Sequence, residues 1–265
     1  MKKIAIEGLI LIILFFSIWF LLFQVDWMKV LKVEKVKDKT EQKLGDLFLE
    51  IFKNEDIEHI NQLIINPIDS LVERICTNND IKRGNIKFHV FDNDDINAFA
   101  LPDGHLVIYS GLILAAENQE ELCGVLCHEM AHIELNHVMK KLIKEVGLSV
   151  LFAMTTGSTG TEMIKETARI FPSSAFDRSL EKAADIQAVK YLIESNIDPE
   201  SYATFLYKLS DTESKAMKYL SWISTHPEPR ERAKYIIEQS DKKVTKTEPV
   251  LSQETWDQLK ELLSE

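Results

Sequence analysis

The hydrophobic pattern changes its period several times along the chain, and each change predicts a different element. Residues 8–25, GLILIILFFSIWFLLFQV, form a run of eighteen residues without a charge. As a helix this run would be about 27 Å long, enough to cross the hydrocarbon core of a bilayer. A cleaved signal peptide and a buried core helix are alternatives, but the run exceeds a usual signal core and no A-x-A-like site follows it. We predict one uncleaved membrane anchor.

Apolar residues recur at helical spacing through much of the remaining chain. Between residues 36 and 76 they alternate with charges, as in EQKLGDLFLEIF, and Pro67 predicts a break between amphipathic helices. The apolar patch 147–154 is too short to span a membrane. We interpret it as a core helix, with a membrane-dipping or substrate-contacting lid as the alternative, followed by a flexible Thr/Gly/Ser loop. Further helices are predicted over 122–137, 179–194, 200–222, 229–240 and 252–263.

A two-residue period replaces the helical one in the middle of the chain. The short β-type runs are IKFHVF (86–91), INAFAL (96–101) and HLVIY (105–109), with DNDD and PDG between them. Such runs separated by turn residues predict a small antiparallel meander. Ser110 is placed to cap the helix that follows, and Asn118 is placed to cap the helix over 122–137.

These elements predict an α+β fold that is mainly helical, has a small antiparallel sheet and is preceded by one transmembrane helix. A chain of 265 residues suits one domain with appendages. The predicted parts are a flank (1–7), the anchor (8–25), a juxtamembrane helical region (26–85), a core (86–240), and a linker with a short C-terminal helix (241–265).

Charge and cysteine content narrow the possible functions. The 42 acidic residues outnumber the 31 basic ones, the net charge is −11, and no basic stripe is present, which excludes nucleic acid as a partner. The cysteines are Cys76, Cys123 and Cys127, and the last two stand one helical turn apart, where disulfide geometry is rare. Cys127 could be a ligand or a nucleophile because it adjoins His128, but we interpret it as an apolar packing residue.

Candidate chemistry is concentrated in LCGVLCHEMAHIELNH, residues 122–137. On a helix, His128 and His132 fall about 40° apart on one face and one turn apart, so they can hold one tetrahedral ion. Glu129 is then close enough to act on a water held by that metal. A surface helix with a solvated polar face is the alternative. Because the chain has only seven histidines, this pattern should rarely arise at random, and the metal site is favoured.

A third protein ligand must come from elsewhere in the chain. In FDRSLEKAADIQAVKYL, Glu181 and Asp185 stand four residues apart and share a helix face. Glu181 could be the third ligand, and Asp185 could accept a hydrogen bond from the distal nitrogen of a ligating histidine. A solvated helix face is the alternative for this pair. The other histidines of the first half, His59, His89 and His105, are interpreted as surface or satisfied structural residues.

The H-E-x-x-H motif followed by R-x-x-E-x-x-A-D resembles the gluzincin metallopeptidases of family M48. That family includes HtpX-like membrane proteases, Oma-type proteases, periplasmic chaperone-proteases and CAAX prenyl proteases. NAFALPDGHLVIYSGLI, HEMAHIELNH and THPEPRER agree with it, and the resemblance covers about residues 85–240. It implies a gluzincin-type domain with its sheet beside a zinc cleft, one Zn²⁺ on His128, His132 and Glu181, and Glu129 as the general base.

The resemblance also assigns residues around the implied cleft. NAFALPDG resembles the edge strand along which the family lays substrate backbone, which brings Asn97 and Ala98 to the cleft. His226 and Arg232 match the family's H-P-x-x-x-x-R pattern and are expected to line it. Three roles are considered for His226: a catalytic donor to the developing oxyanion, a switch that swings onto zinc, and a helix cap. His137 differs in helical phase from the two ligands and is interpreted as structural.

The implied function is that of a membrane-anchored zinc metalloendopeptidase whose substrates are unfolded or membrane-associated proteins or peptides. The chain is expected to lack the multiple spanning helices of the HtpX-like and prenyl proteases. A single anchor with a soluble body most resembles the periplasmic and Oma-type members, which favours protein quality control over prenyl-peptide processing by analogy. The alternative function is a membrane-tethered client-binding or chaperone module with little proteolysis. The catalytic domain is expected on the extracytoplasmic, periplasmic side, although lysines on both sides of residues 8–25 leave the orientation open.

Overall fold

The computed structural model describes residues 33–210, 222–240 and 247–264. The predicted anchor over 8–25 lies outside these residues. The chain divides into two compact units, residues 1–40 and 41–265, and the second unit carries the sheet and the helices from α4 onward. Within the described ranges, no helix is both long and apolar enough to cross a membrane.

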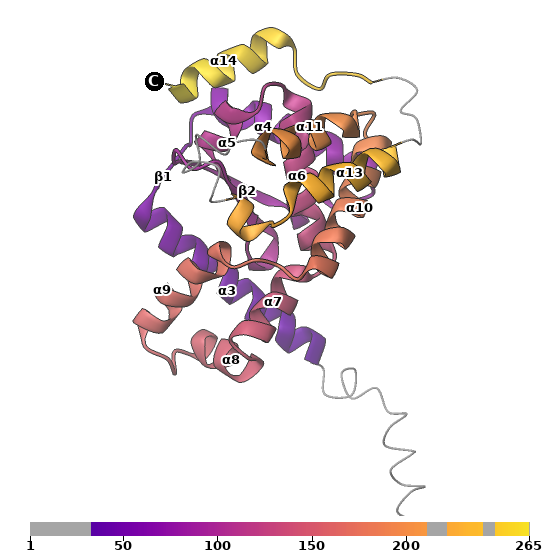
Figure 1. Cartoon of the computed structure of the whole chain (residues 1–265). Helices are drawn as coiled ribbons and strands as arrows, with labels where there is room; N and C mark the ends of the chain where they lie inside the picture. The colour runs from indigo at the N-terminus through magenta and orange to yellow at the C-terminus, as the bar shows by residue number, and fades with distance from the viewer. Residues whose placement is uncertain (1–32, 211–221, 241–246, 265) are drawn as a thin grey trace, which may run out of the picture. The chain divides into compact units, whose positions relative to one another are not determined.

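The described part of the chain is mainly helical, as expected (Figure 1). Its helices are α3 (Val33–Glu55), α4 (Gln62–Asn78), α5 (Ser110–Ala115), α6 (Gln119–Glu134), α7 (His137–Glu145), α8 (Leu148–Thr156), α9 (Thr161–Ile170), α10 (Arg178–Glu194), α11 (Pro199–Ser210), α13 (Pro229–Ser240) and α14 (Gln253–Ser264). Short 3₁₀ turns lie at Arg83–Asn85, Pro102–Gly104 and Phe171–Ser173.

The sheet has four strands and is mixed rather than antiparallel. Its strands are β1 (Ile57–Glu58), β2 (Lys87–Asp92), β3 (Ala98–Ala100) and β4 (His105–Tyr109), in the order β1-β2-β4-β3. β2 and β4 are parallel, whereas β1 with β2 and β3 with β4 are antiparallel. The predicted meander is therefore wrong. All five residues of β4 are buried, and a strand covered on both faces is favoured at the centre of a sheet.

The sheet lies between two apolar cores, and β4 contributes alternately to each. Leu106 and Ile108 belong to a core formed with α4, α5, α6, α10, α11 and α14. Val107 and Tyr109 belong to a second core formed with α3, α7, α8 and α9. In Figure 1, α14 lies at one end of the second unit and the α8–α9 pair lies at the other. Helix α6 lies between these ends.

Pro67 lies inside α4 and does not separate two helices, so the predicted break is wrong. The helix begins after Asn61, whose side-chain oxygen accepts the N–H of Leu63 at 3.0 Å. An interior proline costs a helix about 3 kcal/mol. Six other side chains of α4 are buried, and each contributes about 1.5–3 kcal/mol when it is an aliphatic residue. Burial of the helix outweighs the lost backbone hydrogen bond.

The segment after α7 is more helical than the pattern predicts. Helix α8 buries Leu151 and Met154 but leaves Leu148 and Phe152 about half exposed, so the core-helix interpretation holds for one face only. The predicted flexible loop is shorter than expected, because α8 continues through the threonines and α9 begins at Thr161. The later predictions over 179–194, 229–240 and 252–263 correspond to α10, α13 and α14.

Candidate metal centre

Capping at the start of α6 follows the sequence prediction, whereas capping of α5 does not. The side-chain oxygen of Asn118 accepts the N–H of Glu121 at 2.9 Å and begins α6. Ser110 is the first residue of α5, and its hydroxyl is bonded to both backbone groups of Asn93. The predicted Ser110 cap is therefore wrong, because that hydroxyl ties α5 to the end of β2.

Helix α6 is buried on all sides, which excludes the solvated surface helix. It packs against α10, α11 and β3, and His128, Glu129 and His132 are each 0% exposed. Gly124 allows α11 to approach closely, because a Cβ there would lie 2.4 Å from the Cβ of Tyr202. Polar side chains in such an interior are costly unless they are paired or bind an ion.

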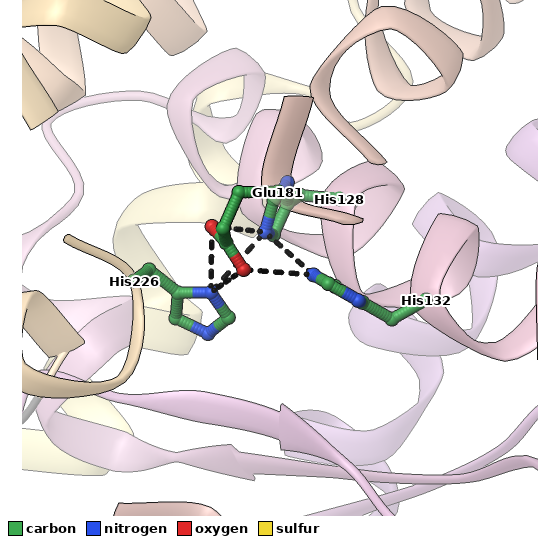
Figure 2. Close-up of side chains that lie close together, drawn as sticks. All are labelled: His128, His132, Glu181 and His226. Carbon is green, nitrogen blue, oxygen red and sulfur yellow. Dashed lines mark hydrogen bonds and ion pairs between the residues drawn. The ribbon is translucent and has the colours of Figure 1, made fainter. Parts of the chain in front are cut away.

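Four buried side chains from three parts of the chain converge beside α6, as Figure 2 shows: His128 and His132 from α6, Glu181 from α10, and His226 from the segment before α13. The Nε2 atoms of His128 and His132 are 3.1 Å apart. Glu181 places Oε2 3.5 Å from His128 Nε2 and Oε1 3.3 Å from His132 Nε2. Nδ1 of His226 lies 3.3 Å from His128 Nε2 and 3.1 Å from Glu181 Oε1.

The donor set and its spacing fit a zinc ion. Ligand atoms at 2.0–2.1 Å from a tetrahedral zinc are about 3.3 Å apart, and the separations of 3.1–3.5 Å bracket that value. Burial lowers the pKa of His132 well below its usual value, which favours the neutral ligand form. Burial opposes ionisation of Glu181, but His226 and Arg232 hold the pKa of that carboxyl well below its usual value. Neutral imidazoles with a carboxylate are common zinc ligands.

Asp185 contacts His128 at Nδ1, the ring nitrogen that does not face the donor cluster. Its Oδ1 lies 2.8 Å from Nδ1 of His128, and both side chains are fully buried. The carboxylate also accepts hydrogen bonds from the hydroxyls of Tyr202 and Tyr235. Burial raises the pKa of Asp185, but Arg232 and His128 outweigh it and hold the pKa far below its usual value. A carboxylate in this position orients the imidazole and fixes its tautomer.

Arg232 is 3% exposed and bridges the two acidic residues of α10. Its Nε and one terminal nitrogen each donate to Asp185 at 2.8 Å, and the other terminal nitrogen lies 2.9 Å from Oε2 of Glu181. Both Arg232 and Glu181 line a cavity of about 180 Å³ together with Tyr235. The guanidinium borders this cavity and pairs with both carboxylates.

Glu129 connects the helix to the edge strand β3. Its Oε2 accepts the backbone N–H of Ala100 at 3.1 Å, and its Oε1 lies 3.3 Å from Nε2 of His226. Burial raises the pKa of Glu129, although His226 and His128 oppose the shift. The expected cleft residues lie along β3, because Ala98 pairs with Ile108 of β4 and Asn97 just precedes the strand. A base candidate and an edge strand thus stand next to the four donors.

His226 lies in the break between helices that Pro227 predicts. Its backbone N–H donates to the carbonyl of Trp222 at 2.8 Å, and the two rings lie 4.7 Å apart. The ring is turned so that Nδ1 lies with the donor atoms and Nε2 faces Glu129. This orientation places His226 among the possible ligands.

His137 makes a contact that the sequence analysis missed. Its Nδ1 lies 3.1 Å from Nδ1 of His132, the nitrogen that faces away from the other donors. Helical phase is misleading here, because Asn136 adopts a left-handed conformation (φ 55°) and ends the helical run before α7 begins at His137. An asparagine, which tolerates this conformation, was the available signal for a helix break.

The cysteines lie outside this cluster. Cys123 and Cys127 are buried in the apolar core on α6, and burial raises the pKa of both thiols. A thiol that stays protonated is neither a ready nucleophile nor a metal ligand. The interpretation of Cys127 as a packing residue is confirmed.

Family comparison agrees with this geometry. The model of peptidase family M48 matches residues 66–240, which include α6, α10 and His226, and the chain belongs to this family. This is a family of peptidases, and the buried cluster of His128, His132, Glu181 and His226 is one that could hold a metal ion.

Particular relatives are proteases from bacteria and from a plant. The chain is 28% identical over 204 residues to a beta-barrel assembly-enhancing protease of Yersinia pestis, an alignment that covers 72% of this chain and 42% of the relative. It is 28% identical over 165 residues to the metalloprotease LoiP of Escherichia coli, covering 60% and 64%. A mitochondrial metalloendopeptidase OMA1 of Arabidopsis thaliana is 26% identical over 143 residues, covering 54% and 29%. The chain spans less than half the length of the first of these.

Proposed function

We propose that this protein is a zinc-dependent endopeptidase that hydrolyses peptide bonds within protein or peptide chains. His128, His132 and Glu181 would hold the ion, in agreement with the donor separations and with membership of family M48. When bound, zinc supplies a Lewis acid that polarises a carbonyl and lowers the pKa of water. The remaining chemistry belongs to side chains of this protein.

Glu129 is the proposed general base. Its carboxylate is buried beside the donor cluster, where Oε2 is held by the N–H of Ala100 and Oε1 faces the cluster. Burial raises the pKa of this carboxyl, and a base with a raised pKa both accepts a proton from water and returns it to the leaving amine near neutral pH. Asp185 and Arg232 are proposed to keep the ligands oriented.

The substrate backbone is proposed to lie along β3 as an added strand. β3 is at an edge of the described sheet, in the order β1-β2-β4-β3, and an extended peptide can pair with such an edge through main-chain hydrogen bonds. Pairing there would bring a peptide bond next to Glu129, because Ala100 of the same strand donates to that carboxylate. Asn97 and Ala98 would contact the bound chain.

The observation that carries this proposal is the buried carboxylate of Glu129 beside the four donors, since a binding site needs no base there. In Glu129→Gln, zinc content and fold should persist while hydrolysis of an unfolded protein such as casein falls by at least about 10²-fold. Glu121→Gln is the matched control, because Glu121 is equally buried on α6 but is paired with Lys208 away from the cluster. Undiminished turnover in Glu129→Gln would rule out the mechanism.

The alternative function is a client-binding or chaperone module with little proteolysis. A wild-type protein that binds unfolded chains but cleaves none of them would support that alternative over the endopeptidase. If the endopeptidase proposal is correct, Glu129→Gln should retain clients that the wild type releases as fragments. Mass spectrometry of these clients would test the proposed role in quality control of unfolded or membrane-associated proteins.

We further propose that residues 8–25 anchor the protein in a membrane as a single span, with the catalytic domain on the extracytoplasmic side. The eighteen uncharged residues of this segment support the proposal. Alkaline extraction of membranes should leave the full chain in the pellet and release the Ile13→Arg, Phe16→Arg double variant, because two charges at mid-span oppose insertion. Equal extraction of both proteins would contradict anchoring.

A further inference from the structure

Lys141 on α7 is a buried cation that the proposed reaction does not use. Its side chain is only 5% exposed, and its ammonium donates to the carbonyl of Phe171 at 2.8 Å and to the carbonyl of Ser174. The ammonium also lies 4.4 Å from the ring centroid of Phe171 and 4.2 Å from that of Phe176. Carbonyl oxygens and aromatic faces both attract a cation, so Lys141 ties together the segment 171–176.

Phe176, at the end of this segment, reaches the metal centre. Its ring stacks on the imidazole of His132 with a centroid distance of 4.0 Å and an interplanar angle of 26°. Two groups cannot both lie about 4 Å above the same face of one ring, so the ring separates the Lys141 ammonium from His132. The backbone N–H of Phe176 also donates to the carbonyl of Thr225 at 3.3 Å, just before His226.

The stacked ring of Phe176 restricts a tilt of the His132 imidazole that its contact with His137 still allows. Outside the donor cluster, His132 is contacted at Nδ1 by Nδ1 of His137, at 3.1 Å. An imidazole held at one nitrogen can still tilt about the hydrogen bond and move Nε2 away from the other donors. Phe176, whose ring is stacked on the imidazole, blocks that tilt on one side.

We propose that Lys141 is a positioning residue for the zinc site, acting through Phe176. By binding the carbonyls of Phe171 and Ser174, it holds the segment 171–176 in place, and Phe176 then keeps the plane of His132 aligned with the other ligands. Without the ammonium, two carbonyls in a buried position lose their partner, and the segment moves to satisfy them. The proposal rests on the proposed zinc site and adds a residue that touches neither metal nor substrate.

Zinc affinity separates this role from a structural one. Lys141→Met nearly keeps the length of the side chain and removes the charge. It should raise the zinc dissociation constant by about 10–100-fold, as loss of the residues that support metal ligands does at other sites. The Co²⁺-substituted variant should show an altered visible spectrum. Lys140→Met is the matched control, because Lys140 is the exposed neighbour on α7 and donates to Leu135. It should retain wild-type affinity and spectrum.

A second pair of variants tests the route through Phe176. Phe176→Leu should change the Co²⁺ spectrum in the same way as Lys141→Met. The zinc affinity of the double variant should equal that of whichever single variant binds zinc more weakly. Additive losses in the double variant would overturn the route. If Lys141→Met is poorly folded, Lys141→Gln, which keeps one donor group, takes its place in both comparisons.

Two outcomes would overturn the proposal in distinguishable ways. A variant of Lys141 that melts earlier but binds zinc with wild-type affinity and an unchanged Co²⁺ spectrum would leave Lys141 a structural residue, with the proposed function intact. A wild-type protein that binds no zinc would remove the proposed function and, with it, any ligand for Lys141 to position.

Discussion

Nδ1 of His128 lies 2.8 Å from Oδ1 of Asp185, and neither side chain is exposed. A carboxylate at Nδ1 favours a proton on that nitrogen, so Nε2, which faces the other donor atoms, is the nitrogen that would bind zinc. In Asp185→Asn, the side-chain amide faces Nδ1 of His128 with either its nitrogen, which cannot accept a hydrogen bond, or its oxygen, a weaker acceptor than a carboxylate. We therefore expect zinc affinity to fall by about 10–100-fold. Competition with a chromophoric chelator measures this change.

Asp177→Asn is the control for that experiment, because Asp177 precedes α10 and forms only a surface ion pair with Lys144. Equal zinc affinity in Asp185→Asn and in the wild type would show that the carboxylate does not support the ligand.

Removal of the proposed third ligand should have a larger effect. In Glu181→Ala we expect the purified protein to lose its zinc, because two imidazoles alone leave the coordination of zinc incomplete. Elemental analysis after dialysis against a weak chelator measures the zinc content. Glu194→Ala, at the exposed end of the same helix, should retain the metal. Wild-type zinc content in Glu181→Ala would reject this residue as a ligand.

Local spacing predicts the parts of the site that one helix carries. His128 and His132 stand four residues apart, as do Glu181 and Asp185, and helical geometry alone places each pair on one face. The structure then brings the two faces together because α6 packs against α10. The spacing of residues within one helix does not predict which distant segment packs against that helix, or on which side.

Two of the missed features, the place of β4 and the role of Phe176, depend on such long-range packing, whereas the His137 contact depends on a local break in the helix. β4 lies between β2 and β3 because it is covered on both faces, a property of the assembled cores and not of the alternation along one strand. His137 reaches His132 because Asn136 redirects the chain. Phe176 is hidden among ordinary apolar residues until its ring is found stacked on His132.

Gly124 should be intolerant of even one methyl group. A Cβ at this position would lie 2.4 Å from the Cβ of Tyr202, so α11 would have to move away from α6. Tyr202 donates to Asp185 at 2.9 Å, and the movement would loosen that contact as well. We expect Gly124→Ala to reduce the free energy of unfolding by about 1–3 kcal/mol, as overpacking does elsewhere. Urea unfolding of the metal-free protein measures the loss.

Gly84→Ala provides the comparison, since a Cβ at Gly84 would meet nothing within 4 Å. A Gly124→Ala protein as stable as Gly84→Ala would show that α6 and α11 do not require this close approach.

His105 should make stability depend on pH below neutrality. Burial, His89 and Lys87 lower its pKa to about 4 against the weaker opposing effects of Asp103 and Asp46. The unfolded chain titrates near pH 6.5, so below that pH it binds a proton that the folded protein does not. The contribution of the depressed pKa is therefore present above about pH 6.5 and is lost as the pH falls toward 4.

The His105→Gln variant isolates this contribution. Between pH 7.5 and pH 5 the wild type should lose about 2 kcal/mol more of its free energy of unfolding than His105→Gln, from the single linked proton. Chemical unfolding of the metal-free proteins at both pH values measures the difference. Parallel losses in the two proteins would contradict the shift.

His226 offers the most informative substitution at the metal centre. Its Nδ1 lies 3.3 Å from Nε2 of His128 and 3.1 Å from Oε1 of Glu181, in the position of a fourth ligand. A ligand there would block the position that a catalytic zinc site keeps open. We therefore expect His226→Ala to raise basal hydrolysis of a short fluorogenic peptide. The factor should equal the inverse of the fraction of wild-type molecules in which His226 leaves the fourth position open.

The size and sign of the change in His226→Ala distinguish the three roles considered for this residue. A tenfold rise would mean that the blocked arrangement is favoured by about 1.4 kcal/mol. A fall in kcat of roughly 10²–10³-fold with little change in KM would instead assign His226 as a donor to the developing oxyanion. Earlier melting with normal turnover per folded molecule would leave it a helix cap. Trp222, whose ring lies 4.7 Å from His226, supplies a control. Trp222→Phe keeps an aromatic ring against the imidazole and should leave basal hydrolysis close to that of the wild type.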